Sequence, residues 1–198
     1  MADDVLLNNA GYGAYGALEA FSMDRIRRQF DTNVLGLMEV TKAVLPHFRQ
    51  NRSGTVINIS SIAGRWVSPG SGWYGASKFA LEALSDALRL ELKAFGVNVV
   101  VVEPGVIATD FANVAAPSIE GALSCSTYGN MMRAVRKSWD AVYRGASQPL
   151  EVALTIERAL TDPTPSARYL CGHQSASVIA SRILPTRLWD SLIRIQMT

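Results

Sequence analysis

Three short apolar runs, separated by two long helical patterns, constrain this chain more than any other feature. The runs cover residues 5–7, 54–61 and 97–103, and the last is almost entirely valine. Apolar, β-branched runs of this length are typical of strands buried on both faces of a sheet. Helical patterns over residues 22–45 and 73–95 lie between the runs. Alternating strands and helices predict an α/β fold with a parallel sheet and crossover helices.

Residues that favour the ends of helices mark the limits of these elements. Ser22 can cap the first long helix, Pro46 lies near its end, and Gly96 follows the second helix, where glycine commonly ends one. Between residues 110 and 147 the pattern weakens, because proline and glycine interrupt it. In that stretch we expect one helix, over 131–143. Beyond it we expect a helix over 149–160, a strand over 168–171 and an amphipathic segment over 181–197.

Composition favours one globular domain without a nucleic-acid or metal-binding role. The chain has 198 residues, of which 48% are hydrophobic, and its net charge of +2 is too small for a nucleic-acid footprint. Cys125 and Cys171 show no metal-ligand spacing and favour a reducing, cytoplasmic setting. His47 and His173 are interpreted as surface or packing residues, and no run is long enough to span a membrane.

The pair Tyr74 and Lys78 carries the clearest chemical signal. Residues four apart on a helix lie on one face, and an ammonium beside a phenol favours the phenolate. We therefore expect Lys78 to lower the pKa of Tyr74 and prepare it for proton transfer. By itself, a tyrosine and lysine pair at this spacing usually lies on the exposed surface of a helix and has no chemical role. However, Ser61 ends a predicted strand, and the carboxyl ends of parallel strands meet at one ligand crevice.

Five motifs in order give the chain a resemblance to a known family. They are N-N-A-G at 8–11, F-D-T-N-V-L-G at 30–36, I-N-I-S-S at 57–61, Y-G-A-S-K at 74–78 and P-G-V-I-A-T at 104–109. With Ser61 thirteen residues before Tyr74, the chain resembles the short-chain dehydrogenase/reductase family over residues 4–112, and more loosely beyond. The resemblance implies a Rossmann-like parallel sheet with flanking helices.

The resemblance also implies roles for four residues. Tyr74 would be the general acid/base, and Lys78 would lower its pKa and bind the nicotinamide ribose hydroxyls. Ser61 would hydrogen-bond the substrate oxygen and stabilise the charge that develops on it. Asn33 would hold a water in a proton relay to Lys78. Alternatively, Asn33 could cap or kink its helix, and Ser60 and Ser61 could be ordinary turn residues.

A nicotinamide cofactor, NADP or NAD with NADP slightly favoured, follows from the same resemblance. Its expected binding set, besides Tyr74 and Lys78, is Asn9, Ala10 and Gly11 on the adenosine side and Pro104, Gly105, Ile107 and Thr109 near the nicotinamide. Gly11, Gly13 and Gly16 form G-x-G-x-x-G, but the resemblance places this motif after a middle strand. We do not expect it to be the phosphate-binding loop.

The family pattern further includes an N-terminal β-α-β-α-β portion with a glycine-rich T-G-x-x-x-G-x-G loop. Nothing before Val5 supplies it. We therefore expect residues 1–198 to form a single, truncated Rossmann-like domain that is unstable or weakly active alone. The strand over residues 5–7 would then leave an apolar edge exposed.

Residues 110–148 are expected to form a flap over the substrate. Their apolar side chains suit a hydrophobic alcohol or ketone, such as a steroid-, retinoid- or lipid-like carbonyl compound, but could equally pack the flap onto the sheet. The side chains are Phe111, Ile119, Leu123, Met131, Met132, Trp139 and Tyr143.

Two other functions stay open. The chain could be an inactive fragment that acts as an interaction module, because in the family the two long helices often form the interface of a dimer or tetramer. It could also bind a membrane surface through the apolar stripe within residues 183–195.

Overall fold

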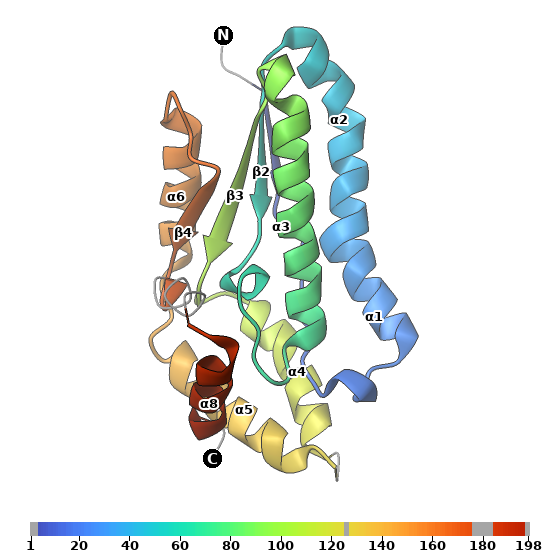
Figure 1. Cartoon of the computed structure of the whole chain (residues 1–198), viewed down its shortest axis with the longest axis vertical. Helices are drawn as coiled ribbons and strands as arrows, with labels where there is room; N and C mark the ends of the chain where they lie inside the picture. The colour runs from blue at the N-terminus through green and yellow to red at the C-terminus, as the bar shows by residue number, and fades with distance from the viewer. Residues whose placement is uncertain (1–3, 125–126, 176–183, 197–198) are drawn as a thin grey trace.

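The computed structural model describes residues 4–124, 127–175 and 184–196 (Figure 1). Four parallel strands form one sheet in the order β1-β2-β3-β4. They are β1 (Val5–Asn8), β2 (Thr55–Ile59), β3 (Asn98–Pro104) and β4 (Arg168–Cys171). The predicted α/β fold with a parallel sheet is confirmed. Strand β1 lies at one edge, where Val5 and Leu7 are exposed.

Helices cover both faces of this sheet. One face carries α1 (Met23–Phe30), the π-helical turn η2 (Asp31–Gly36), α2 (Leu37–Asn51) and α3 (Gly72–Leu92), which continues as the short turn η4 (Lys93–Phe95). The other face carries α6 (Pro149–Thr161). Side chains alternate along the strands: Val56 and Val99 pack with Leu88 of α3, whereas Ile57 and Val100 pack on the opposite side with α6.

Helix α2 runs six residues beyond the expected end at Leu45, so the prediction that it stops near Pro46 is wrong. Pro46 lies inside the helix, which ends at Asn51, and Arg52 then adopts a left-handed conformation with φ of 51°. Proline removes one backbone hydrogen bond from a helix. Packing of the last turn offsets this loss, because the Phe48 side chain is buried against Val56 and Leu92.

Within the described residues, three helices lie at the carboxyl end of the strands: α4 (Phe111–Leu123), α5 (Gly129–Tyr143) and α8 (Thr186–Gln196) (Figure 1). The expectation of a single helix between residues 110 and 147 is therefore wrong. Helix α4 forms around Pro117 because tertiary contacts hold it: Ile119 is fully buried, and the Ser118 hydroxyl accepts a 2.9 Å hydrogen bond from the Tyr15 backbone N–H. Sequence periodicity does not report such contacts.

Within the described ranges, none of the helices has the length and apolar character needed to cross a membrane. Helix α8 directs Trp189 toward Trp66, with ring centroids 5.8 Å apart, and Leu188 and Leu192 are exposed. The predicted apolar stripe is thus partly exposed. The side chain of Ile195, also in that stripe, lies outside the described residues. Membrane binding through this helix stays a prediction.

Candidate active site

Ser61, Tyr74 and Lys78 come together at the carboxyl end of β2. Ser61 lies two residues beyond the end of the strand and caps the turn η3 (Ile62–Gly64), where its hydroxyl accepts a 3.1 Å hydrogen bond from the Ala63 N–H. Tyr74 and Lys78 lie in the first two turns of α3. Tyr74 also has a side-chain hydrogen bond with Ser61. All three residues line one cavity of about 620 Å³.

Most of the predicted cofactor-binding residues line the same cavity. Asn9 and Gly11 reach it from the segment after β1, and the segment after β3 contributes Pro104, Gly105, Ile107 and Thr109. Ala10 and Asn33 are not among the lining residues. Three strand ends therefore converge on one crevice, as expected for the carboxyl edge of an open parallel sheet.

The pKa of Tyr74 is raised in the structure, whereas the sequence predicted that it is lowered. Burial raises it to about 12, and the hydrogen bond with Ser61 opposes this rise. Lys78 does not offset it, and Nζ of Lys78 donates a 2.9 Å hydrogen bond to the carbonyl oxygen of Ile59. Burial lowers the pKa of Lys78 to about 8. The expected lowering of the Tyr74 pKa by Lys78 is absent from this structure.

Asn33 lies in the π-helical turn η2 and is almost fully buried. Its side-chain nitrogen donates to the Tyr12 carbonyl oxygen at 2.8 Å and to Oγ of Ser77 at 3.0 Å. Its oxygen accepts a 3.0 Å hydrogen bond from the Tyr12 N–H. π-Helical turns of this kind often occur at functional sites. The position fits the interpretation that Asn33 distorts its helix, and the water relay to Lys78 stays a prediction.

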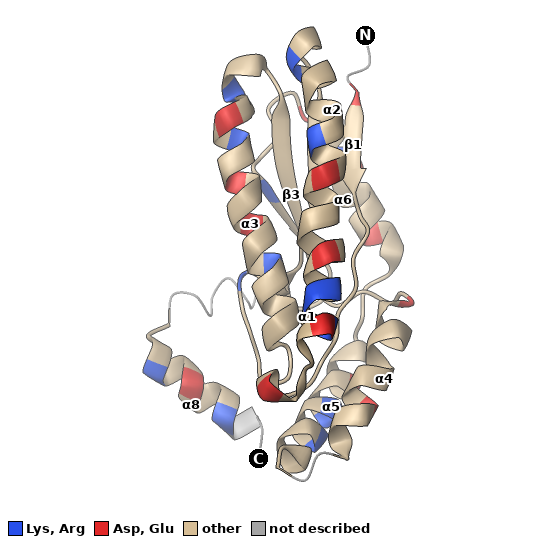
Figure 2. Ribbon diagram, turned by 90° about the vertical axis from the view of Figure 1, so that its right-hand side faces the viewer, with Lys and Arg blue, Asp and Glu red and all other residues tan. Residues whose placement is uncertain are grey.

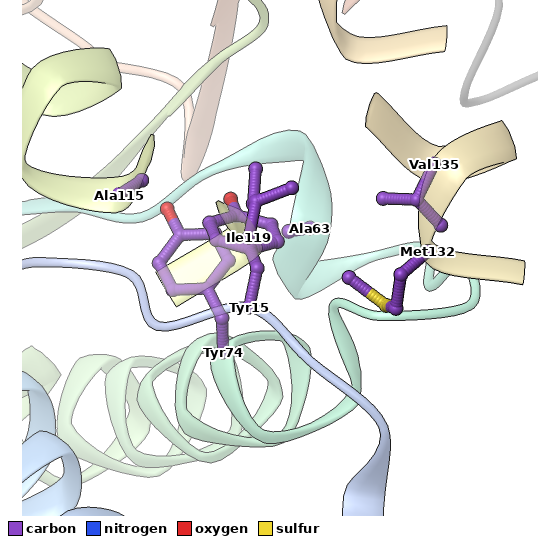
Figure 3. Packing of buried hydrophobic residues seen from close by; sticks show 7 residues of the cluster. All are labelled: Tyr15, Ala63, Tyr74, Ala115, Ile119, Met132 and Val135. Carbon is purple, nitrogen blue, oxygen red and sulfur yellow. The ribbon is translucent and has the colours of Figure 1, made fainter. Parts of the chain in front are cut away.

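Five aromatic rings form a continuous wall of the cavity, and Tyr74 is one of them. Neighbouring ring centroids are 4.6–5.7 Å apart along the series Phe111, Tyr74, Tyr15, Trp139 and Tyr143. Figure 3 shows Tyr15 beside Tyr74, with the buried side chains of Ile119 and Met132 nearby. Tyr15 was not predicted as a site residue, because nothing in the local sequence distinguishes it from other loop tyrosines.

The glycine motif at residues 11–16 supports these rings. A β-carbon at Gly13 would come within 2.8 Å of Phe111, 2.9 Å of Tyr15 and 3.3 Å of Tyr74. At Gly16 it would come within 2.8 Å of Phe21. The missing side chains thus allow close packing of aromatic rings, which explains the motif without a phosphate-binding role.

The apolar residues predicted to form the flap divide between two roles: some pack in the core, and others line the cavity. Ile119 and Met132 are fully buried in the core cluster that contains Tyr74, and Leu123 and Met131 pack partly buried against it. Phe111, Trp139 and Tyr143 line the cavity. Helix α8 adds Ile193 to this lining, a contribution that the sequence did not suggest.

The other residues singled out in the sequence lie apart from this chemistry. His47 is exposed and pairs with Asp4 at 2.6 Å, and His173 is exposed beside Gly145. Both agree with surface roles. Cys171 is a free, buried residue of β4, and Cys125 lies outside the described residues. No set of three potential metal ligands occurs in the part of the chain that the structure describes.

Comparisons with known proteins agree with this fold. The profile of the family described as short chain dehydrogenase matches residues 3–119. A probable short-chain type dehydrogenase/reductase of Helicobacter pylori is 38% identical over 97% of this chain and 70% of its own length. A 3-ketodihydrosphingosine reductase of Bacteroides thetaiotaomicron is 47% identical over 56% of this chain and 41% of its own length.

A solved structure shares the architecture. Serine dehydrogenase complexed with NADP+ superposes with a TM-score of 0.70 at 30% identity, covering 85% of this chain and 64% of that one. The fold and the site define an α/β oxidoreductase with its cleft at the strand ends. The chain belongs to the short-chain dehydrogenase/reductase family.

The packing around Gly13 predicts that Gly13→Ala displaces the Tyr74 ring. Because the added methyl group would overlap two rings, we expect a lower melting temperature and a weaker near-ultraviolet circular dichroism signal. Gly121→Ala is the matched control: no atom lies within 4 Å of its β-carbon position in α4, so the change should stabilise the helix by about 1 kcal/mol. Equal melting temperatures for the two variants would contradict the packing account.

Proposed function

We propose that this chain interconverts a hydrophobic alcohol and its ketone or aldehyde, with a nicotinamide cofactor and Tyr74 as general acid/base. The observation that carries the proposal is the convergence of the Tyr74 phenol, the Ser61 hydroxyl and the Lys78 ammonium on one cavity. A proton donor, a hydrogen-bond donor for an oxygen and a cation are the groups that carbonyl reduction requires.

Each of the three residues has a distinct task in this proposal. In reduction, Oη of Tyr74 donates its proton to the carbonyl oxygen of the substrate, and in oxidation it accepts that proton back. The Ser61 hydroxyl hydrogen-bonds the same oxygen and stabilises its developing negative charge. The ammonium of Lys78, on the same face of α3 as Tyr74, binds the ribose hydroxyls of the cofactor.

The lining residues fit the nicotinamide half of such a cofactor. Lys78 lines the cavity, and Gly11 leaves space beside its ammonium: a β-carbon at Gly11 would lie 3.6 Å from Nζ of Lys78. Lys78 can therefore hold ribose hydroxyls, while the segment from Pro104 to Thr109 borders the ring. When bound, the nicotinamide supplies or accepts the hydride. The NADP+ bound to serine dehydrogenase supports NADP or NAD here.

The wall of the cavity favours a neutral, apolar substrate. Among the described lining residues Lys78 is the one with a charged side chain, so a positively charged substrate group would find no carboxylate to pair with. Tyr15, Phe111 and Trp139 offer aromatic faces for an apolar body. The similarity to a reductase of a ketone named 3-ketodihydrosphingosine supports a lipid-like carbonyl compound.

Tyr74→Phe is expected to lower turnover of a medium-chain ketone with NADPH or NADH by about a hundredfold or more, because it removes the proton donor and leaves the ring in place. Consumption of the reduced nucleotide, followed at its near-ultraviolet absorbance, measures the effect. Tyr12→Phe is the control, since Tyr12 does not line the cavity. Equal turnover of the two variants would show that Tyr74 is not the acid/base.

A second role, assembly into a homodimer, is favoured by exposed apolar side chains on the two long helices. Leu35, Val40, Phe79 and Leu90 are 40–65% exposed. They belong to η2, α2 and α3, and Figure 2 shows α1–α2 and α3 side by side on one face. Apolar groups on a helical face of this kind are typical of an association surface.

Sedimentation velocity tests the dimer. The wild-type chain should sediment as a dimer at micromolar concentration, and Phe79→Glu should shift it to a monomer, because a carboxylate on an apolar interface loses its hydration without gaining a partner. A monomeric wild-type protein would contradict this assembly.

A further inference from the structure

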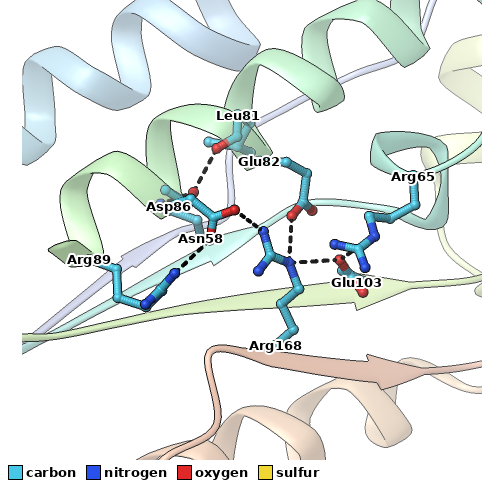
Figure 4. Close-up of polar contacts among 9 residues, drawn as sticks. Asn58, Arg65, Leu81, Glu82, Asp86, Arg89, Glu103 and Arg168 are labelled. Carbon is cyan, nitrogen blue, oxygen red and sulfur yellow. Dashed lines mark hydrogen bonds and ion pairs between the residues drawn. The ribbon is translucent and has the colours of Figure 1, made fainter.

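A cluster of charged side chains, which includes the buried residues Glu82 and Glu103, links α3 to the neighbouring strands (Figure 4). Arg168 of β4 is its centre: Nε lies 3.1 Å from Glu82 and 3.4 Å from Glu103, and the terminal nitrogen Nη2 lies 2.7 Å from Asp86. Glu82 and Asp86 belong to α3, and Glu103 belongs to β3. The cluster therefore joins the helix that carries Tyr74 and Lys78 to two strands of the sheet.

Glu82 connects this cluster to Lys78. The two residues are four positions apart on α3, so they lie on the same helical face, and both are about 5% exposed. Burial lowers the pKa of Lys78 to about 8, and the negative charge of Glu82 opposes that fall. An ion–ion interaction is strong in this setting, because little water screens it.

Few other groups can set the charge of Lys78. Glu82, on the same helix, is the charged group that acts on Lys78, and Tyr74 lies one turn before Lys78 on that helix. The strand β2 contributes the carbonyl oxygen of Ile59. The neighbouring loop and the turn η2 contribute Gly11 and Asn33, which do not titrate.

The surroundings of Glu82 are more strongly charged. Arg168 of β4 pairs with it, Asp86 of the same helix shares that arginine, and Glu103 of β3 lies beside it. Burial, and then the charge of Glu82, raises the pKa of Glu103 to about 7. Arg65, in the turn after Ser61, lies 3.6 Å from Glu103 and adds a second cation.

The same carboxylate also packs against the turn that follows Ser61. A β-carbon at Gly64 would come within 2.9 Å of Cγ and 3.2 Å of Oε1 of Glu82, and within 2.8 Å of Oγ of Ser60. Glu82 thus touches the turn after β2 and lies one helical turn from Lys78.

We propose that Glu82 is a positioning residue of the active site: its carboxylate, ion-paired with Arg168, keeps the buried ammonium of Lys78 charged at neutral pH. This inference rests on the proposed function, in which Lys78 acts as a cation beside Tyr74. It assigns a role to a side chain that does not itself line the cavity.

The titration of Lys78 tests this proposal directly. The chain contains four lysines, so the carbon-13 Cε resonance of Lys78 can be assigned by its loss in Lys78→Met. In the wild type we expect a titration midpoint near pH 8. In Glu82→Gln the midpoint should fall by about one pH unit, because the stabilising negative charge is gone.

Asp86→Asn is the matched control. It removes another carboxylate that binds Arg168, but Asp86 is one turn farther along the helix, and Lys78 should titrate as in the wild type. Glu82→Asp keeps the charge on a shorter side chain and should give an intermediate midpoint, which also serves if Glu82→Gln does not fold. Melting curves show which variants are folded.

An unchanged Lys78 midpoint in folded Glu82→Gln or Glu82→Asp would overturn the proposal, because a purely structural role lowers the melting temperature without moving this titration. An equal shift in Asp86→Asn would also overturn it. The measurement uses neither nucleotide nor substrate. A chain that binds no nucleotide would therefore contradict the proposed function, whereas an unchanged Lys78 titration would contradict this inference, so the two failures are distinguishable.

Discussion

One hydrogen bond, from Nζ of Lys78 to the carbonyl oxygen of Ile59, ties the site helix to the end of its neighbouring strand. Ser61 follows Ile59 by two residues, and Tyr74 precedes Lys78 by one helical turn. The bond therefore fixes the register between α3 and β2 that places the serine hydroxyl against the phenol. The bond also engages one N–H group of the buried Lys78 ammonium. The charge of that ammonium depends on the groups packed around it.

The glycine loop and the charged cluster support this arrangement from two sides. Gly13 lets the rings of Phe111, Tyr15 and Tyr74 approach one another, so the phenol is held within an aromatic wall. On the other side, the carboxylate of Glu82 lies one turn beyond Lys78 and is paired with Arg168. The close packing of the aromatic rings and the ion pairing of Glu82 both restrict movement of the face of α3 that carries Tyr74 and Lys78.

Much of the fold and of the candidate site could be predicted from the sequence, because local residue patterns determine them. The strands β1, β2 and β3 follow from apolar β-branched runs, and the family motifs direct attention to Ser61, Tyr74 and Lys78. The incorrect predictions concern features that depend on tertiary contacts. Helix α4 forms around Pro117 because Ile119 is buried, and burial rather than Lys78 determines the direction of the Tyr74 pKa shift. Neither effect can be read from residue spacing.

Nucleotide binding tests most directly whether this cavity is the site of a nicotinamide-dependent oxidoreductase. Trp66 and Trp139 line the cavity, so their fluorescence should report occupancy. The account predicts saturable quenching by NADPH or NADH, with affinity at least about tenfold weaker in Lys78→Met, because that variant loses a charge-assisted hydrogen-bond donor worth about 1.5–3 kcal/mol. Equal binding by Lys78→Met and wild type, or no saturable quenching by either nucleotide, would contradict it.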